Sequence, residues 1–118
     1  MFYYLASPYS KYPDGIEEAF KVACRGAATL IRAGVPVYSP IAHTHPIAIH
    51  GAIDPYDHSI WLPADEPLMH SAKGLVVLMA RSWKDSRGVG FEIGTFEEIG
   101  KPIFYMDPYD IPDGLNRR

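Results

Sequence analysis

The sequence predicts a single-domain α/β protein, in which helices cover both faces of a mostly parallel sheet of four to five strands. Three observations predict this three-layer α/β/α class. A length of 118 residues suits one domain and leaves no room for two independent cores. Short apolar runs alternate with segments of helical spacing. The apolar runs are nearly continuous, which is typical of parallel strands buried on both faces.

Four short apolar runs predict the strands, and turn residues border them. The run GLVVLMA is the clearest of the four, because it is apolar throughout. The runs are FYYLA (2–6), VPVYSP (35–40), GLVVLMA (74–80) and PIFYM (102–106). The segment after the last run, DPYDIPDGLNRR, is expected to be a polar tail.

Three segments carry apolar residues at helical spacing: 16–33, 58–72 and about 89–99. Gly34 and Gly100 follow the first and third segments, where a glycine commonly ends a helix. Pro63 and Pro67 interrupt the second segment, although the apolar spacing continues through it.

Residues 41–57 contain several prolines, glycines and histidines and no sustained period. This composition predicts a long loop with no more than one helical turn. The resulting order of strands and helices is that of flavodoxin-like and Rossmann-like domains, so residues 1–118 are expected to form one such domain.

Composition excludes several classes of partner. A formal net charge of -3 gives no electrostatic footprint for a nucleic acid polymer. No apolar run approaches the roughly 20 residues that a membrane span needs. The first residues have no basic region before their apolar run, so we expect no secretory signal and a cytoplasmic protein. The single cysteine, Cys24, allows no internal disulfide.

Ligands of open parallel sheets bind outside the carboxyl ends of the strands. In this sequence, that rule selects three segments: Ser7–Ser10, Pro40–His50 and Arg81–Gly90. The unusual residues of the chain are concentrated in the same three segments. We therefore expect the functional site at this edge of the sheet.

The stretch DSRGVGFEIGTF (85–96) places Glu92 shortly after Gly88 and Gly90. Glycines let the backbone approach a ligand, and the N–H groups of a helix start favour a bound anion. The same helix start is expected to keep Glu92 ionised, as a nucleophile at an anomeric carbon requires. Spacing alone favours the simpler alternative, in which Glu92 only complements the helix dipole.

The segment SRGVGFEIG (86–94) resembles the active-site segment of the nucleoside 2-deoxyribosyltransferase superfamily, which includes 2′-deoxynucleoside 5′-monophosphate N-glycosidases. The resemblance implies that Glu92 is the nucleophile and forms a covalent sugar–enzyme intermediate. Through YLASPYS (4–10), it places Tyr4 beside that nucleophile. Through ADEPLMHSAKGLVVL (64–78), it gives Asp65 the handling of the leaving base. The stretches YSPIAHTHPIA, WLPAD and SRGVGFEI are most similar to a small bacterial and phage branch of the superfamily.

Ser86 stands where superfamily members acting on unphosphorylated nucleosides tend to have an aspartate. A serine hydroxyl at a helix start suits a phosphate dianion, which an aspartate would repel. A nucleoside 5′-monophosphate is therefore the favoured substrate. Ser10 replaces the arginine that contacts phosphate in the related hydrolases. Four basic residues are substitutes among which the sequence does not choose: Lys11, Arg81, Lys84 and Arg87.

The resemblance implies an enzyme that needs no cofactor and cleaves the base–sugar bond of a (deoxy)nucleoside 5′-monophosphate. Transfer of the sugar to a second base is an alternative, because water and base compete at the same step. A domain that binds a nucleotide or nucleotide sugar without turnover is another, and an unrelated flavodoxin-like interaction domain is the last.

Several further residues are candidates for substrate contact. Ser7, Tyr9 and Ser10 follow the first strand, and Ser86, Gly88 and Gly90 precede or begin the last helix. Trp61, Trp83 and Tyr9 suit stacking on a base or packing in the core equally well. His43 or His45 is expected to touch sugar or base, with a solvated loop as the alternative. HTHP lacks the accompanying cysteines or carboxylates of a metal site, so no metal is predicted.

Relatives of this size complete each active site with residues of a neighbouring subunit. The resemblance therefore implies a homodimer or homotetramer with shared active sites. The tail MDPYDIP (106–112) is the expected contributor, with Met106, Asp107 and Tyr109 in place of the family's usual C-terminal residues.

Overall fold

The computed structural model describes residues 1–117. Its strands and helices alternate as the sequence predicts, except that two helices lie between the second and third strands. The elements are β1 (Tyr3–Ala6), α1 (Ile16–Arg32), β2 (Val37–Tyr38), α2 (Pro40–His50), α3 (His58–Ser71), β3 (Gly74–Leu78), a short 3₁₀ helix η1 (Trp83–Asp85), α4 (Arg87–Glu98) and β4 (Ile103–Met106).

The four strands form one parallel sheet in the order β2-β1-β3-β4. The first strand of the chain is therefore central, with Tyr3 opposite both Val37 of β2 and Gly74 of β3. Every residue of β1 and β3 is buried. This arrangement confirms the predicted α/β class with a parallel sheet, and it places the carboxyl ends of all four strands at one edge.

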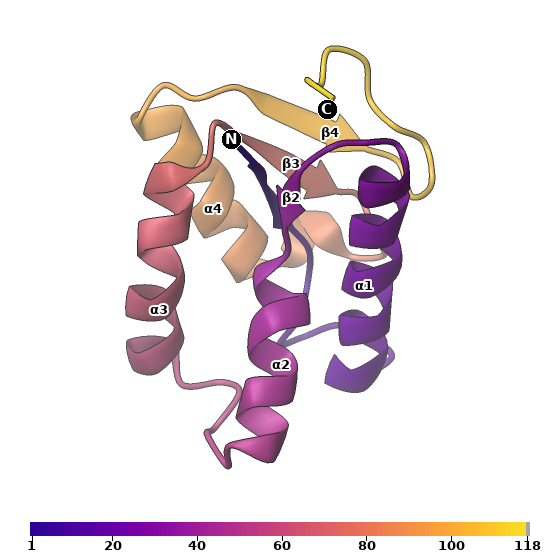
Figure 1. The fold of residues 1–118 in the computed structure, drawn as a ribbon. Coiled ribbons are helices and arrows are strands. Elements are labelled where there is room, and N and C mark those ends of the chain that lie inside the picture. Colours follow the sequence, from indigo (N-terminus) through magenta and orange to yellow (C-terminus); the bar gives the residue numbers. More distant parts are fainter. Residues whose placement is uncertain (118) are drawn as a thin grey trace.

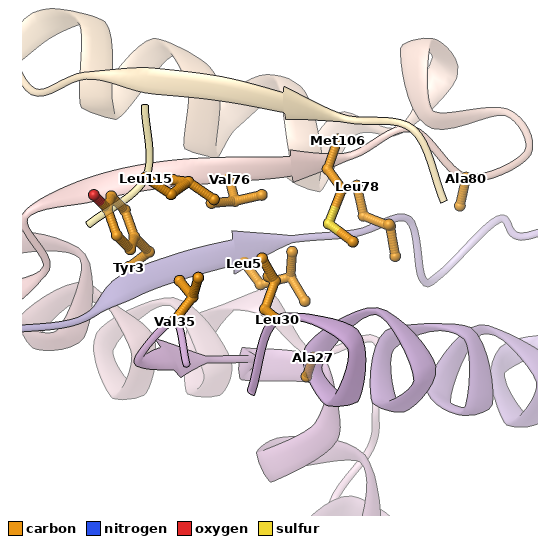
Figure 2. Packing of buried hydrophobic residues seen from close by; sticks show 10 residues of the cluster. All are labelled: Tyr3, Leu5, Ala27, Leu30, Val35, Val76, Leu78, Ala80, Met106 and Leu115. Atoms are coloured by element: carbon orange, nitrogen blue, oxygen red, sulfur yellow. The ribbon is translucent and has the colours of Figure 1, made fainter. Parts of the chain in front are cut away.

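Helices cover both faces of the sheet (Figure 1). On one face, α1 packs over residues such as Leu5 and Val76, as Figure 2 shows. On the other face, α3 and α4 pack over Tyr4 and Val77. Alternate strand residues thus serve two separate cores, which confirms the three-layer arrangement. None of the helices within residues 1–117 has the length and apolar character that crossing a membrane requires.

Residues 40–50 form the helix α2, so the prediction of a long loop over 41–57 was wrong in this part. Ser39 caps the helix by accepting a hydrogen bond from the Ala42 N–H at 3.2 Å, and Pro40 begins it. The apolar residues Ile47 and Ile49 are exposed, 41% and 52%. Because apolar side chains surround this helix instead of forming one stripe, its sequence shows no helical period.

The sequence predicted a polar tail after β4, but this segment also contributes an apolar residue to the core. Leu115 is buried in the core on the α1 face, beside Tyr3 and Val76 (Figure 2). The backbone N–H of Asn116 donates to the Tyr3 hydroxyl at 2.9 Å, and this hydroxyl lies 3.3 Å from Asn116 Oδ1. The tail therefore packs against the chain's own first strand. Met106, a proposed contributor to a neighbouring subunit, is buried within the same core.

Candidate active site

A cavity of about 350 Å³ lies at the carboxyl edge of the sheet. Its walls are the loop after β1, one side of α2 and α3, and the first turns of α4. These are the segments that the position rule for open parallel sheets selects, together with α3. Eight of the predicted site residues line the cavity: Tyr4, Ser7, Tyr9, Ser10, Asp65, Ser86, Gly88 and Glu92.

Tyr4 lies on β1 under the cavity and is fully buried. Its hydroxyl lies beside the Glu92 carboxyl group without completing a hydrogen bond of normal geometry. Burial is the main reason that the pKa of Tyr4 is far above its usual value, and the charges of Glu92 and Asp65 raise it further. Tyr4 therefore keeps its proton, and its hydroxyl hydrogen is available for a hydrogen bond to the carboxylate or to a ligand.

Glu92 is the sixth residue of α4 and lines the cavity together with Asp65. Burial raises the pKa of Glu92 to about 8, the Tyr4 hydroxyl lowers it, and the Asp65 charge raises it. Burial therefore outweighs the helix start, and the expectation that the helix start keeps Glu92 ionised was wrong. The helix dipole acts within the first turn, and Glu92 lies beyond it.

Asp65 lies on α3 and faces the same cavity. Burial raises its pKa to about 6, while the nearby His43 side chain lowers it. Its Oδ1 atom is buried and has no hydrogen-bond partner. The two carboxyl groups thus line one cavity, and the charge of Asp65 raises the pKa of Glu92.

Four buried side-chain polar atoms within residues 1–117 have no hydrogen-bond partner: Tyr4 Oη, Ser7 Oγ, Tyr38 Oη and Asp65 Oδ1. Three of these residues line the cavity. Tyr38 lies beside them, because its ring packs on Tyr4 at 5.9 Å and burial together with the Asp65 charge raises its pKa to about 12. Buried polar groups normally have partners, so this cluster fits a polar ligand.

Tyr38 was not among the predicted site residues. It ends the two-residue strand β2 directly before the cap of α2. The available signal was the position of this tyrosine at the carboxyl end of a predicted strand, where a ligand is expected.

Ser86 is the N-cap of α4, and its Oγ accepts a hydrogen bond from the Val89 N–H at 3.2 Å. Ser86, Arg87 and Gly88 all line the cavity at this helix start. Gly90 does not line it, and its N–H donates to the Ser86 carbonyl within the helix at 3.0 Å. The predicted anion cradle therefore consists of the first helical residues and excludes Gly90, since α4 begins two residues earlier than expected.

Of the four basic residues proposed for a phosphate, only Arg87 lines this cavity. Arg81 forms a surface ion pair with Asp14 at 3.1 Å, and the Lys84 ammonium lies over the Trp83 ring. Lys11 and Arg87 line a second cavity of about 300 Å³, which adjoins the first along Tyr9, Ser10 and Ser86.

The two predicted tryptophans have different positions. Trp61 lines the cavity, and its indole N–H donates to the Asp54 carbonyl at 2.9 Å. Trp83 does not line it and packs instead against Tyr105 of β4, with 5.7 Å between the ring centroids. For Trp83, core packing on the sheet is therefore the observed role.

The two histidines of HTHP lie on α2 and face different surroundings. His43 is exposed, packs against Tyr38 and does not line the cavity, although it influences Asp65. His45 is 3% exposed and hydrogen-bonds to Tyr9 and Glu17. Within residues 1–117, no three histidine, cysteine or acidic residues are grouped so as to hold a metal ion.

Residues 2–108 match the model of a protein family that is described as "Domain of unknown function (DUF1937)". A search of curated proteins gives no match to this sequence. The family match covers all strands and helices of the domain and every residue that lines the cavity. The chain belongs to the DUF1937 family.

Proposed function

We propose that this protein is an N-glycosidase that cleaves the base–sugar bond of a nucleoside 5′-monophosphate. The observation that carries the proposal is the convergence of Glu92, Asp65 and the Tyr4 hydroxyl in one cavity, on three different elements. Two carboxyl groups with unequal surroundings are what a retaining glycosidase uses. The resemblance of SRGVGFEIG to the nucleoside 2-deoxyribosyltransferase superfamily supports the same chemistry.

In the first step, a Glu92 carboxylate oxygen forms a bond to C1′ while the bond from C1′ to the base nitrogen breaks. The base leaves with the electron pair of that bond and takes a proton delivered by or through Asp65. In the second step, water attacks C1′ and gives a proton to the Asp65 carboxylate, while the bond from C1′ to Glu92 breaks. Tyr4 donates a hydrogen bond to the Glu92 carboxylate before the attack and after its release.

The order of the two pKa values bears on the protonation state that the proposed mechanism needs. With pKa values of about 8 for Glu92 and about 6 for Asp65, the singly protonated cavity holds its proton mainly on Glu92. The reactive form has the proton on Asp65 instead, so it is the minor one of the two singly protonated forms. A ligand atom that accepts a hydrogen bond from protonated Asp65 increases the population of this form.

A phosphate on the substrate is supported by the helix start of α4. The Ser86 hydroxyl hydrogen, the Arg87 guanidinium and the first N–H groups of the helix are available at the cavity wall. Ser7 contributes a buried hydroxyl group without a partner on the adjacent wall. These donors suit a dianion, which favours a nucleotide over a free nucleoside.

The test is a chromatographic assay for free base with a panel of ribo- and deoxyribonucleoside 5′-monophosphates. We expect base release by the wild type and a loss of about a thousandfold or more in Glu92→Ala, since that variant has no nucleophile. Glu98→Ala is the matched control, because Glu98 is exposed on the same helix and does not line the cavity.

The same assay separates the alternatives. If the base of the nucleotide is released only when a second free base is present, the protein is a transferase. If nucleotides raise the melting temperature but no base appears under either condition, the cavity binds without turnover, and the glycosidase proposal is wrong.

A further inference from the structure

Three side chains form a hydrogen-bonded chain from the protein surface to the cavity. Glu17 of α1 lies 2.9 Å from Nε2 of His45 on α2, and Nδ1 of His45 lies 2.6 Å from the Tyr9 hydroxyl. Tyr9 lines the cavity in the loop after β1. The His45 ring is buried and stacks on Phe20, with 4.6 Å between centroids and 26° between planes. The three hydrogen-bonded side chains therefore come from three separate segments, which fix their relative positions.

The chemistry of the outer group fixes the direction of both hydrogen bonds. Glu17 is 66% exposed, and an ionised carboxylate only accepts hydrogen bonds. Nε2 of His45 must therefore carry a hydrogen and donate it to Glu17. In a neutral imidazole, the other nitrogen then has a lone pair, so Nδ1 accepts the hydrogen of the Tyr9 hydroxyl.

This direction determines what Tyr9 offers to the cavity. Its only polar hydrogen points to His45, so its oxygen presents lone pairs elsewhere. Tyr9 also keeps that hydrogen at neutral pH, because burial raises its pKa to about 12. A ligand atom beside this oxygen has to donate a hydrogen bond, whereas a phosphate oxygen or a carbonyl group would meet another acceptor.

We propose that Tyr9 is a specificity-determining residue, whose oxygen accepts a hydrogen bond from a hydroxyl or amino group of the ligand. Glu17 and His45 are positioning residues that fix this polarity. The inference rests on the proposed function to the extent that the ligand is a nucleotide. A donor of this kind exists on the sugar as a hydroxyl and on several bases as an amino group. The phosphate then belongs at the Ser86 side of the cavity.

The first test is made on the free protein, by nitrogen nuclear magnetic resonance of ¹⁵N-labelled histidine. We expect the hydrogen of His45 on Nε2 and a bare Nδ1. In Glu17→Lys, an ammonium group that only donates faces Nε2, so the hydrogen is expected to move to Nδ1. Glu18→Lys is the matched control, because it makes the same charge change one residue along the helix, where Glu18 pairs with Arg25. A wild-type protein with hydrogen on Nδ1 contradicts the proposal.

The second test measures Kd by calorimetry for nucleoside 5′-monophosphates that differ in one donor, in the Glu92→Ala background to prevent turnover. One set removes the 2′- or 3′-hydroxyl, and the other removes the amino group of the base. We expect one of these donors to improve binding about tenfold, and Tyr9→Phe to abolish that preference. The preference survives in Glu18→Lys and is lost in Glu17→Lys.

The outcomes for the two proposals are distinguishable. Donor preference through Tyr9 without any base release contradicts the proposed reaction and supports this inference. Base release with no donor preference, or a preference that persists in Tyr9→Phe, contradicts this inference alone. Failure of every nucleotide to bind contradicts both.

Discussion

Glu92 and Asp65 bring the same functional group into one cavity, but burial raises their pKa values to different levels, about 8 and about 6. For both residues, burial disfavours the charged form. The Tyr4 hydroxyl partly offsets this effect at Glu92, and His43 offsets it at Asp65. The protein thus keeps two carboxyl groups with raised pKa values in one cavity, at the expense of stability.

The first prediction concerns stability. The pKa of Glu92 is higher in the folded protein than its ordinary 4.5, so its contribution to stability is fully present below about pH 4.5 and is lost as pH rises through about 8. Glu92→Gln keeps the shape without the charge. We expect it to match the wild type at pH 4.5 and to exceed it by up to about 5 kcal/mol at pH 8.5.

Urea unfolding at the two pH values measures this difference, with Glu98→Gln on the exposed side of α4 as the control. Equal stabilities of wild type and Glu92→Gln at pH 8.5 would show that the Glu92 pKa is not raised.

The second prediction concerns the rate. Since the reactive form carries one proton, kcat/KM should rise through about pH 6 and fall above about pH 8. Asp65→Asn removes the group that must be protonated, so its residual activity, lower by about 10²–10⁴-fold, should rise with pH and stay level. The rise should come below pH 8, because the Asp65 charge no longer raises the pKa of Glu92. A decline at high pH in Asp65→Asn would assign the acid to another residue.

At the scale of elements, close packing within the sheet depends on glycine at one position. Gly74 begins β3 between β1 and β4, and an added Cβ would lie 2.9 Å from the Pro102 carbonyl oxygen and 3.3 Å from the Tyr3 ring. The nearest obstacle is backbone, which cannot rotate away. By contrast, an added Cβ at Gly94 on α4 meets nothing within 4 Å.

The third prediction compares the same substitution at these two glycines. Gly74→Ala should lower the free energy of unfolding by about 1–3 kcal/mol, because the strands must separate to admit the methyl group. Gly94→Ala should raise it by about 0.5–1 kcal/mol, because alanine favours the helix. Chemical denaturation of both variants checks the pair, and a loss at Gly94 would indicate that α4 is packed on that side.

The sequence predicted the elements whose apolar residues form one stripe or one continuous run. The strand 74–78 and the first helix are examples, and α3 forms in spite of Pro63 and Pro67. The sequence did not predict α2, because the exposed isoleucines of this helix interrupt the helical spacing of its apolar residues. At the site, Glu92, Asp65 and Tyr4 converge as the resemblance implied. Trp83 and Gly90 do not line the cavity. Trp83 packs against Tyr105, and the Gly90 N–H forms a hydrogen bond within the helix.

At the scale of the whole molecule, residues far apart in the sequence complete the core on the α1 face. Tyr3 of the central strand contacts Leu115 and Asn116, more than a hundred residues later. Hydrophobic residues in the tail are too few to form a recognisable pattern, so no period or run predicts this contact. The tail nevertheless shields part of the core that α1 leaves uncovered (Figure 2).

The fourth prediction tests that shielding. Leu115→Ala should lower the free energy of unfolding by about 2 kcal/mol, because it opens the core beside Tyr3 and Val76. Ile31→Ala is the control, since Ile31 is 53% exposed on α1 and should change stability by about 0.5 kcal/mol or less. Thermal unfolding of both variants measures the contrast, and equal effects would mean that the tail contributes no core.

The attachment of α3 has a consequence for how the cavity receives a ligand. Only the C-terminal part of this helix enters the core, through Met69 and the adjoining Ala72, and Lys101 holds this end through the carbonyl oxygens of Met69 and Ala72. Residues 58–64 are exposed or half-buried. One wall of the cavity is thus anchored at a single end, whereas the floor under Tyr4 belongs to the central strand. In hydrogen exchange, amides of residues 58–66 should exchange far faster than those of 3–6, and bound nucleotide should slow them selectively. On this basis, we expect Asp65 to move with its helix when a ligand binds, whereas Tyr4 stays fixed with the central strand.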